Sequence, residues 1–216
     1  MPRNVVGGFF ALLCLAIAAP SQAYDLVGNG AVGVRGGTLV FTQDQEIKKD
    51  ASPRLAGDMV FSYVYTDRAT VDVIVGYGWN RLDSGTDKFW LVTSTPITIG
   101  TRFAVKDGKV YRPFLGAGGG LYVWSVQNKQ LDAAKDPVTL ERLRRADLGF
   151  YGTVGVERRM SKHISMLGDW SYHYILAKDV VDFPSGYNGN KGYYQVRLGL
   201  ELFFSLSERI DSGLPE

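Results

Sequence analysis

Bulky apolar and polar residues alternate one by one along residues 193–204, near the end of the chain. The first set comprises Tyr194, Val196, Leu198, Leu200, Leu202 and Phe204. The second set comprises Tyr193, Gln195, Arg197, Gly199, Glu201 and Phe203. Because successive residues of a β-strand point to opposite faces, this period of two predicts a strand with one apolar and one polar face. Residues 71–80 and 164–174 alternate in the same way.

Alternation bounded by turn-forming residues predicts eight strands in all. The expected ranges are 30–41, 56–66, 70–80, 89–105, 110–124, 148–158, 164–176 and 191–204. Most of these ranges hold ten or more residues. Strands of soluble proteins average about 5 to 6 residues, whereas a tilted membrane-spanning strand needs about 9 to 11. The lengths therefore favour strands that cross a bilayer.

The links between these strands alternate strictly between short and long. The short links are 66–70, 106–109 and 159–163, and the long links are 42–55, 81–88, 125–147 and 177–190. Outer-membrane barrels have short periplasmic turns at one rim and longer extracellular loops at the other. The sequence thus predicts an all-β fold, an eight-stranded antiparallel up-and-down transmembrane β-barrel with both termini on the periplasmic side.

The N-terminus resembles a cleaved secretory signal. Arg3 is followed by an apolar run over 5–19 and by Ser21-Gln22-Ala23, which has small residues where signal peptidase cleaves. We therefore expect a signal peptide over 1–23, a barrel over 24–204 and a short periplasmic tail over 205–216, in a protein of the bacterial outer membrane. Cys14 is the only cysteine, so the mature chain has no disulfide.

Composition narrows the classes of function. The chain has 24 Lys and Arg against 22 Asp and Glu, so no basic excess indicates nucleic-acid binding. The two histidines and the single cysteine show no metal-ligand spacing, and we expect neither a metal nor another cofactor. A soluble lipocalin-like barrel is the competing fold, and it would place the apolar residues inside and the polar ones outside.

The polar face of the strands predicts what fills the barrel. It collects nine charged residues of both signs, and buried charges are tolerated when they pair. These residues are Arg35, Asp58, Asp72, Arg102, Arg112, Glu157, Asp169, Arg197 and Glu201. We expect them to form a lumenal salt-bridge network with the arginines at its centre. Inward glycines at 116, 118, 120, 155 and 199 would leave room for large side chains opposite them.

Two stretches carry a family resemblance. Residues 111–122 (YRPFLGAGGGLY) resemble the aromatic-x-Pro-aromatic-x-Gly-x-Gly strand of the OmpA and OmpX-like outer-membrane β-barrel superfamily, and residues 155–165 resemble its strand, periplasmic turn and returning strand. The resemblance covers roughly 30–204 and implies the barrel fold. It says little about function, because members include structural proteins, adhesins, pores and lipid-modifying enzymes.

The residue types for acyl transfer occur together on one expected strand face, at Asp169, Ser171 and His173. Residues two apart on a strand extend in parallel, however, and a hydroxyl must lie within about 2.6 to 3.2 Å of the imidazole. The outer-membrane lipid A deacylases carry His-x-Ser, whereas Tyr174-Ile175 follows His173 here. We therefore expect no catalytic residue and no enzymatic activity, with a lipid A-modifying acyl hydrolase as the enzyme alternative.

The longest link contains Asp136-Pro137, which predicts a short helix over 137–146 that would fold across the barrel mouth. Its arginines Arg142, Arg144 and Arg145 could contact lipopolysaccharide phosphates or a partner. The expected function is a structural or surface-interaction role for a monomer embedded in lipid and lipopolysaccharide, with a possible extracellular ligand at the long loops. A narrow pore for ions or small solutes is the alternative.

Overall fold

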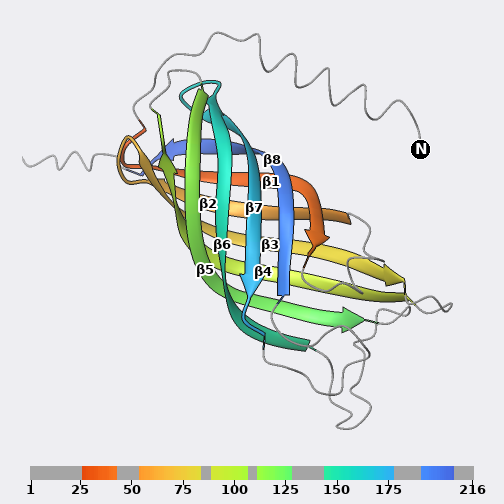
Figure 1. Ribbon diagram of the computed structural model, residues 1–216. Coiled ribbons are helices and arrows are strands. Elements are labelled where there is room, and N and C mark those ends of the chain that lie inside the picture. Colours follow the sequence, from red (N-terminus) through yellow and green to blue (C-terminus); the bar gives the residue numbers. More distant parts are fainter. Residues whose placement is uncertain are drawn as a thin grey trace, which may run out of the picture.

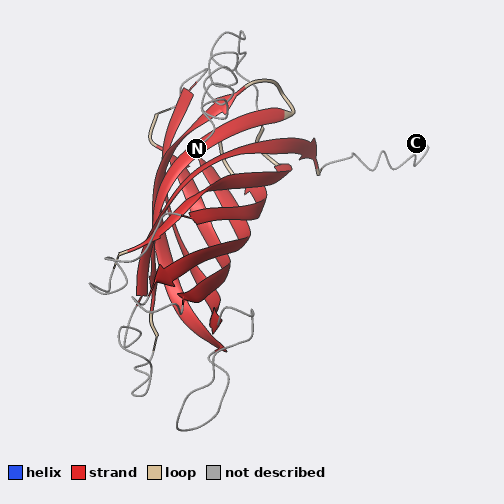
Figure 2. Cartoon of the chain, turned by 90° about the vertical axis from the view of Figure 1, so that its right-hand side faces the viewer, coloured by secondary structure: helices blue, strands red, loops and turns tan. Residues whose placement is uncertain are grey.

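The computed structural model describes residues 26–42, 54–83, 89–106, 111–127, 144–177 and 191–206. Its strands are β1 (Asn29–Phe41), β2 (Arg54–Val64), β3 (Ala69–Asp83), β4 (Phe89–Ala104), β5 (Tyr111–Gln127), β6 (Arg144–Arg159), β7 (Ile164–Ile175) and β8 (Lys191–Ser205). Each strand pairs antiparallel with its neighbours in the chain, and β1 pairs with β8 to close the barrel (Figures 1 and 2). The predicted eight-stranded up-and-down barrel is confirmed. No helix within the described ranges is long and apolar enough to cross a membrane.

The apolar face of each alternating strand lies on the outside of the barrel. On β8, Val196, Leu200 and Leu202 are 55%, 48% and 57% exposed, while Arg197 and Glu201 between them are buried. A contiguous apolar surface of this kind suits lipid and would aggregate in water. The lipocalin-like alternative, which needs the opposite orientation, is wrong.

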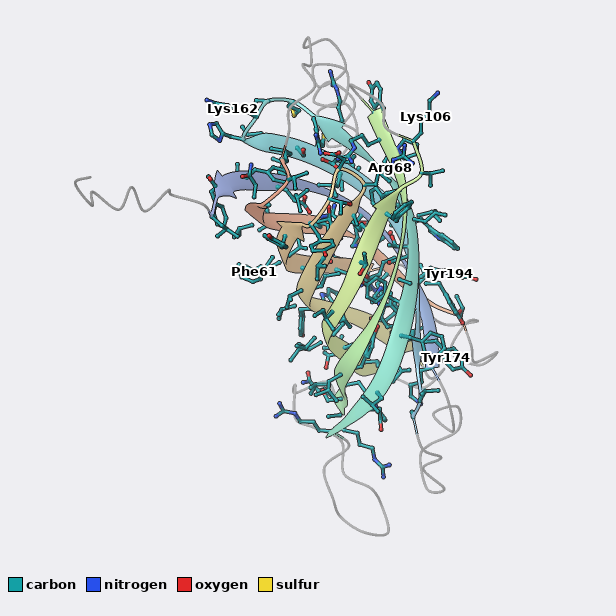
Figure 3. All side chains as sticks on the ribbon, turned by 90° about the vertical axis from the view of Figure 1, so that its left-hand side faces the viewer. Phe61, Arg68, Lys106, Lys162, Tyr174 and Tyr194 are labelled. Atoms are coloured by element: carbon teal, nitrogen blue, oxygen red, sulfur yellow. The ribbon has the colours of Figure 1, made fainter. Side chains whose placement is uncertain are left out.

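Aromatic side chains group on the outer surface toward the rim that carries most of the longer links. Trp170 stacks on Tyr194 with ring centroids 5.2 Å apart, and Tyr172 contacts Tyr194 at 4.9 Å. Phe150 and Tyr174 form a further pair at 5.2 Å. Figure 3 shows Tyr174 and Tyr194 away from the end of the barrel that carries Lys106 and Lys162. Such a group is typical of the girdle at a membrane interface.

Both ends of the barrel sequence lie at one rim, where Asn29 pairs with Ser205. The turns at 65–68 and 160–163 share this rim. They are tight, since the Tyr65 amide donates to the Ala69 carbonyl at 3.0 Å and the Met160 amide to the Ile164 carbonyl at 2.9 Å. The predicted strict alternation is wrong at one link, because cross-strand pairing carries β3 on to Asp83 and shortens the next link to 84–88.

The longest link is also shorter than predicted, because β6 begins at Arg144 and β5 continues to Gln127. Ser125 pairs with Arg144, and the indole nitrogen of Trp124 donates to the Asp147 carboxylate at 2.6 Å. The prediction of a helix as far as 146 is therefore wrong for residues 144–146, where pairing to β5 extends the ladder. Residues 137–143 of that helix lie outside the described residues.

The predicted segment boundaries fall mostly outside the described ranges. The signal peptide over 1–23 stays a prediction, as does the part of the tail beyond 206. The barrel itself ends slightly later than expected, since Ser205 belongs to β8 and pairs with Asn29.

Candidate functional site

Four charged side chains form a closed ring of ion pairs inside the barrel. Arg35 on β1 contacts Asp58 on β2 at 2.6 Å and Asp169 on β7 at 3.3 Å. Arg197 on β8 contacts the same two carboxylates at 2.8 Å and 2.7 Å. Two positive and two negative charges therefore balance, and the ring joins four adjacent strands on both sides of the closure between β1 and β8.

Burial makes this ring sensitive to the loss of any one member. The four side chains are 1–3% exposed, so their charges are removed from water and depend on one another. Removing one partner of a buried pair costs about 3–5 kcal/mol, because the remaining charge is left uncompensated. Without Asp58, for example, both guanidinium groups would share the single carboxylate of Asp169.

Glycines make room for the ring, as the sequence predicted. A Cβ added at Gly199 would lie 2.3 Å from Cγ of Arg35, and one at Gly155 would lie 2.9 Å from Cβ of Asp169. Real Cβ atoms do not approach neighbours this closely. The absence of a side chain at these positions is therefore what lets the charged side chains cross the strands.

A second group of charges lies nearer the rim where Asn29 pairs with Ser205. Arg102 on β4 contacts Asp72 at 2.5 Å and Glu201 at 2.8 Å. The Ser62 hydroxyl donates to Asp72 at 2.7 Å and accepts from Arg102 at 3.1 Å. The guanidinium also lies over the ring of Phe114, 5.6 Å from its centroid. Arg102 thus links β2, β3, β5 and β8 across the barrel.

A third group surrounds Glu157 on β6. Arg112 contacts its carboxylate at 3.5 Å and Arg159 at 3.4 Å, while the Ser165 hydroxyl donates to it at 3.0 Å. Arg112 also donates to the backbone carbonyl of Asp67 in the turn between β2 and β3. Sequence reasoning placed Arg159 in a turn and missed it, although it has the same strand parity as Glu157.

All nine predicted lumenal residues therefore lie on the inner face of the barrel, and each makes an ion pair. They are separated into three groups, where a single network was expected. The reason is visible along β2, where Val60 lies between Asp58 and Ser62. Val60 and its cross-strand partner Ile74 lie between the ring and the Arg102 group, and Tyr151 packs against both of them.

On the other side of the ring, an aromatic layer surrounds His173. The imidazole stacks on Tyr193 at 4.6 Å and on Tyr151 at 5.3 Å, and the Tyr122 hydroxyl is 2.9 Å from its Nδ1. These side chains are all nearly fully buried. Tyr122 and Tyr151 were not singled out from the sequence. The signal was their inward parity next to Gly149 and Gly118, whose added Cβ atoms would lie 2.7 Å and 2.6 Å from the two rings.

Ser171 and His173 are closer than strand geometry suggested. The Ser171 hydroxyl lies 3.1 Å from Nε2 of His173, so the expectation that the two side chains could not meet is wrong. The Tyr122 hydroxyl lies 2.9 Å from the other ring nitrogen, Nδ1. Asp169 does not complete a triad, since its carboxylate is occupied by Arg35 and Arg197. Ser171 and His173 are 0% and 2% exposed, so no substrate reaches this pair in the described structure.

The loop arginines proposed from the sequence do not form a group in the described residues. Arg144 and Arg145 are exposed at the start of β6 and not on a loop helix, and Arg142 lies outside the described residues. Within the described ranges, no three His, Cys, Asp or Glu side chains are arranged to hold a metal ion.

Several solved structures are similar to this chain in shape. Neisserial surface protein A matches with a TM-score of 0.53 and 13% identity, over 82% of this chain and 99% of that chain. OprG from Pseudomonas aeruginosa has a TM-score of 0.47 at 10% identity, over 85% and 99% of the two chains. E. coli outer membrane protein W has a TM-score of 0.46 at 16% identity, over 81% and 98%. No protein-family model matches this chain, and no curated protein matches its sequence.

Proposed function

We propose that this chain, which has the fold of the OmpA- and OmpX-like outer-membrane β-barrels, is a closed barrel with a structural or surface-interaction role. The observation that carries this proposal is the neutral ring of Arg35, Asp58, Asp169 and Arg197, which is buried, with Val60 and Ile74 on one side of it and the aromatic layer around His173 on the other. Eight strands enclose an interior that side chains can just fill. Here they fill it with aromatic side chains and with charged groups that pair with one another.

Such a barrel would act through its surfaces. Its outer face would be solvated by outer-membrane lipid and lipopolysaccharide, and its extracellular links would be free to meet a ligand. We propose that the barrel acts as a monomer.

Planar-bilayer conductance tests the closed barrel against the narrow pore. We expect the refolded mature protein to give no steady current step above that of the bare bilayer, because an ion would have to break the charge ring and pass the aromatic layer. Insertion is verified in the same preparation by the difference in gel mobility between unheated and boiled samples. Reproducible single-channel steps from protein that shows this mobility shift would contradict the proposal.

Mass analysis of lipopolysaccharide tests the enzyme alternative, which the contact between Ser171 and His173 keeps open. We expect lipid A from cells that express the wild-type protein and from cells that express His173→Ala to carry the same number of acyl chains. The physical reason is that both side chains are buried and have no route to lipid A. Loss of an acyl chain in the wild-type sample alone would establish the hydrolase.

A further inference from the structure

The chain folds back on itself just before β1 and places Leu26 inside the mouth of the barrel. Leu26 packs with Ala31 on β1, Val64 on β2 and Phe203 on β8, and all four side chains are buried. The three strand residues have the same parity as the charged side chains of the lumen, so they point inward. They lie at the rim where β1 begins and β8 ends, which we call the terminal rim. Leu26 is therefore an apolar plug in the lumen at the terminal rim.

A tight turn holds this plug against the barrel. The Asn29 amide donates to the Leu26 carbonyl at 3.0 Å, and the Gly28 amide donates to the Val64 carbonyl at 2.8 Å. Gly28 has a φ of 81°, the positive value that the third residue of a type II turn requires. Glycine adopts this conformation without a steric penalty, whereas other residues rarely do. Gly28 therefore sets the direction in which the chain returns to the mouth.

The plug lies directly outside the Arg102 group, the second of the three charge groups. Phe203 follows Glu201 on the inner face of β8, and Val64 follows Ser62 on the inner face of β2. Glu201 is 0% exposed, although it is only one inward position away from the apolar cluster at the mouth. Because ion pairs are stronger away from water, a seal at this level stabilises the Arg102 group.

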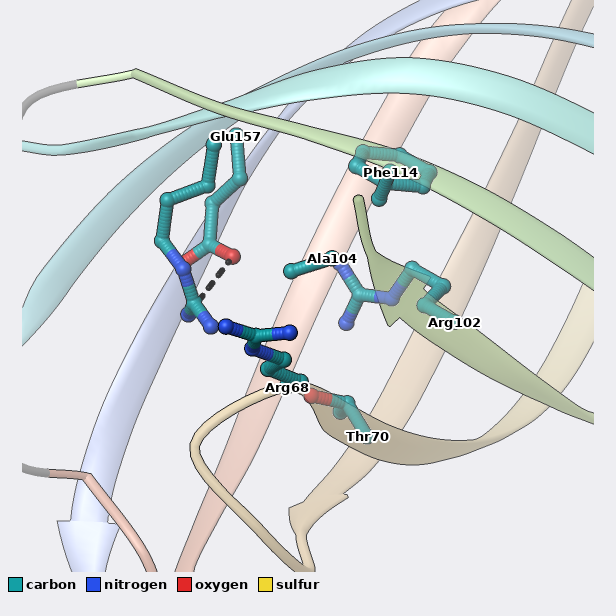
Figure 4. Close-up of a pocket in the computed structure, with 7 residues that line it drawn as sticks. Arg68, Thr70, Arg102, Ala104, Phe114 and Glu157 are labelled. Carbon is teal, nitrogen blue, oxygen red and sulfur yellow. Dashed lines mark ion pairs between the residues drawn. The ribbon is translucent and has the colours of Figure 1, made fainter. Parts of the chain in front are cut away.

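The opposite wall of the mouth is formed by β4 and β5, which lie across the barrel from β1 and β8. A small pocket in this wall is lined by residues that include Arg68, Arg102 and Phe114 (Figure 4). It has room for about one water molecule. A solute larger than water does not fit this pocket, so Leu26 and the side chains of the opposite wall together narrow the mouth.

We propose that residues 26–28 form a retractable plug: Leu26 closes the lumen at the terminal rim, and its withdrawal admits water and small ions to the Arg102 group. Segments close to a chain end open locally at low cost unless a buried contact ties them down. The side chain of Leu26 supplies this contact. The plug is separate from the ring that contains Arg35 and Arg197, so its opening and closing do not depend on whether the barrel conducts.

Thiol labelling measures the plug in the mature protein refolded in octyl glucoside. Prepared from Tyr24 onward, this protein has no native cysteine, because Cys14 belongs to the predicted signal peptide. Val64→Cys places a reporter thiol beside Leu26, and Lys162→Cys places one on an exposed turn of the same rim. With a charged methanethiosulfonate reagent, we expect the thiol at position 64 to react at least about tenfold more slowly than the thiol at position 162.

Two variants withdraw the plug by different means, and both are measured with the Val64→Cys reporter. Leu26→Ser removes the buried apolar side chain, and we expect labelling at least about tenfold faster. Gly28→Ala leaves the apolar cluster intact, and its Cβ meets nothing within 4 Å, so only the positive φ becomes unfavourable. We expect this strain in the turn to accelerate labelling about fivefold or more.

Val27→Ser is the matched control, since it changes the next residue of the same segment, which is 46% exposed. We expect it to change the labelling rate by no more than about twofold. The difference in gel mobility between unheated and boiled samples verifies that each variant is folded. If Leu26→Ser does not fold, Gly28→Ala is compared with the control in its place. Unchanged labelling in the folded plug variants, or equal acceleration by Val27→Ser, would overturn the proposal.

Discussion

At the scale of single residues, the lumen depends on pairing large side chains with glycines. Arg35 occupies the space that a side chain at Gly199 would need, and Tyr151 lies over Gly118 and reaches Gly100 on the next strand. A barrel of eight strands has little interior volume, so each arginine or tyrosine needs an empty position opposite it. The glycines therefore supply the space that the charge ring and the apolar cluster occupy.

The substitution Gly199→Ala tests this pairing. Its Cβ would lie 2.3 Å from Cγ of Arg35 and 2.6 Å from the Val34 carbonyl, and the backbone oxygen cannot move aside cheaply. We expect the free energy of unfolding to fall by about 1–3 kcal/mol, the usual cost of overpacking. Urea unfolding of the refolded barrel in micelles provides the measurement.

Gly36→Ala is the matched control, since it lies next to Arg35 on β1 and an added Cβ meets nothing within 4 Å. We expect its free energy of unfolding to change by no more than about 0.5 kcal/mol. Equal stability of the two variants would show that the lumen does not need the space at Gly199.

At the scale of strands, cross-strand pairing decided where elements end. The alternation in sequence weakens near the tips of β5 and β6, yet Val123 pairs with Ala146 and Trp124 with Arg145. The hydrogen bond from Trp124 to Asp147 supports this extension from inside the hairpin. The dipeptide Asp136-Pro137 predicted a helix running to 146. Residues 144–146 instead pair with β5, because this pairing gives their backbone N–H and C=O groups hydrogen-bond partners on the neighbouring strand.

Hydrogen exchange measured by mass spectrometry tests the extended strand. We expect peptides that cover residues 144–148 to exchange as slowly as those that cover their β5 partners at 121–125, because both take part in one ladder. Peptides from the turn at 160–163 give the reference for fast exchange. If residues 144–148 exchanged as fast as this turn, the hairpin would end before Arg144.

At the scale of the whole molecule, the barrel is an apolar cylinder around a polar and aromatic core. This arrangement inverts that of a soluble protein, and it is stable because lipid replaces water as the outer solvent. Loss of lipid would expose residues such as Val196, Leu200 and Leu202 together. The three internal charge groups and the aromatic layer then explain how the interior accommodates so many polar groups.

A charged residue on the outer face tests the lipid environment. We expect Leu200→Arg to lower the free energy of unfolding in phosphatidylcholine vesicles by about 2–4 kcal/mol, because Leu200 lies well inside the apolar surface of β8. Phe204→Arg, close to the C-terminal end of the same strand, is the control and should cost only about 0–1 kcal/mol. Equal and small costs at both positions would mean that Leu200 does not face hydrocarbon.

Much of this architecture could be predicted from local sequence. Period-two alternation assigned the inner and outer faces, because the two faces of a strand are set by covalent geometry alone. It therefore placed all nine charged residues on the inner face. Turn residues and strand lengths were enough to predict eight strands and the rim to which the termini belong. Partners were predictable only where hairpin register pairs them, as for Arg35 with Asp58 and for Asp169 with Arg197.

Local alternation therefore sets which residues face the lumen, whereas the closure of the barrel sets which of them come into contact. The contacts of Arg35 with Asp169 and of Arg197 with Asp58 exist because β1 closes on β8 with Arg35 opposite Gly199. The division of the charges into three groups depends on Tyr151 reaching Val60 and Ile74 from another part of the barrel. The register in which β1 pairs with β8 depends on the shifts between all the neighbouring strands of the barrel. No local pattern in the chain therefore encodes which residues lie at the same height along the barrel axis.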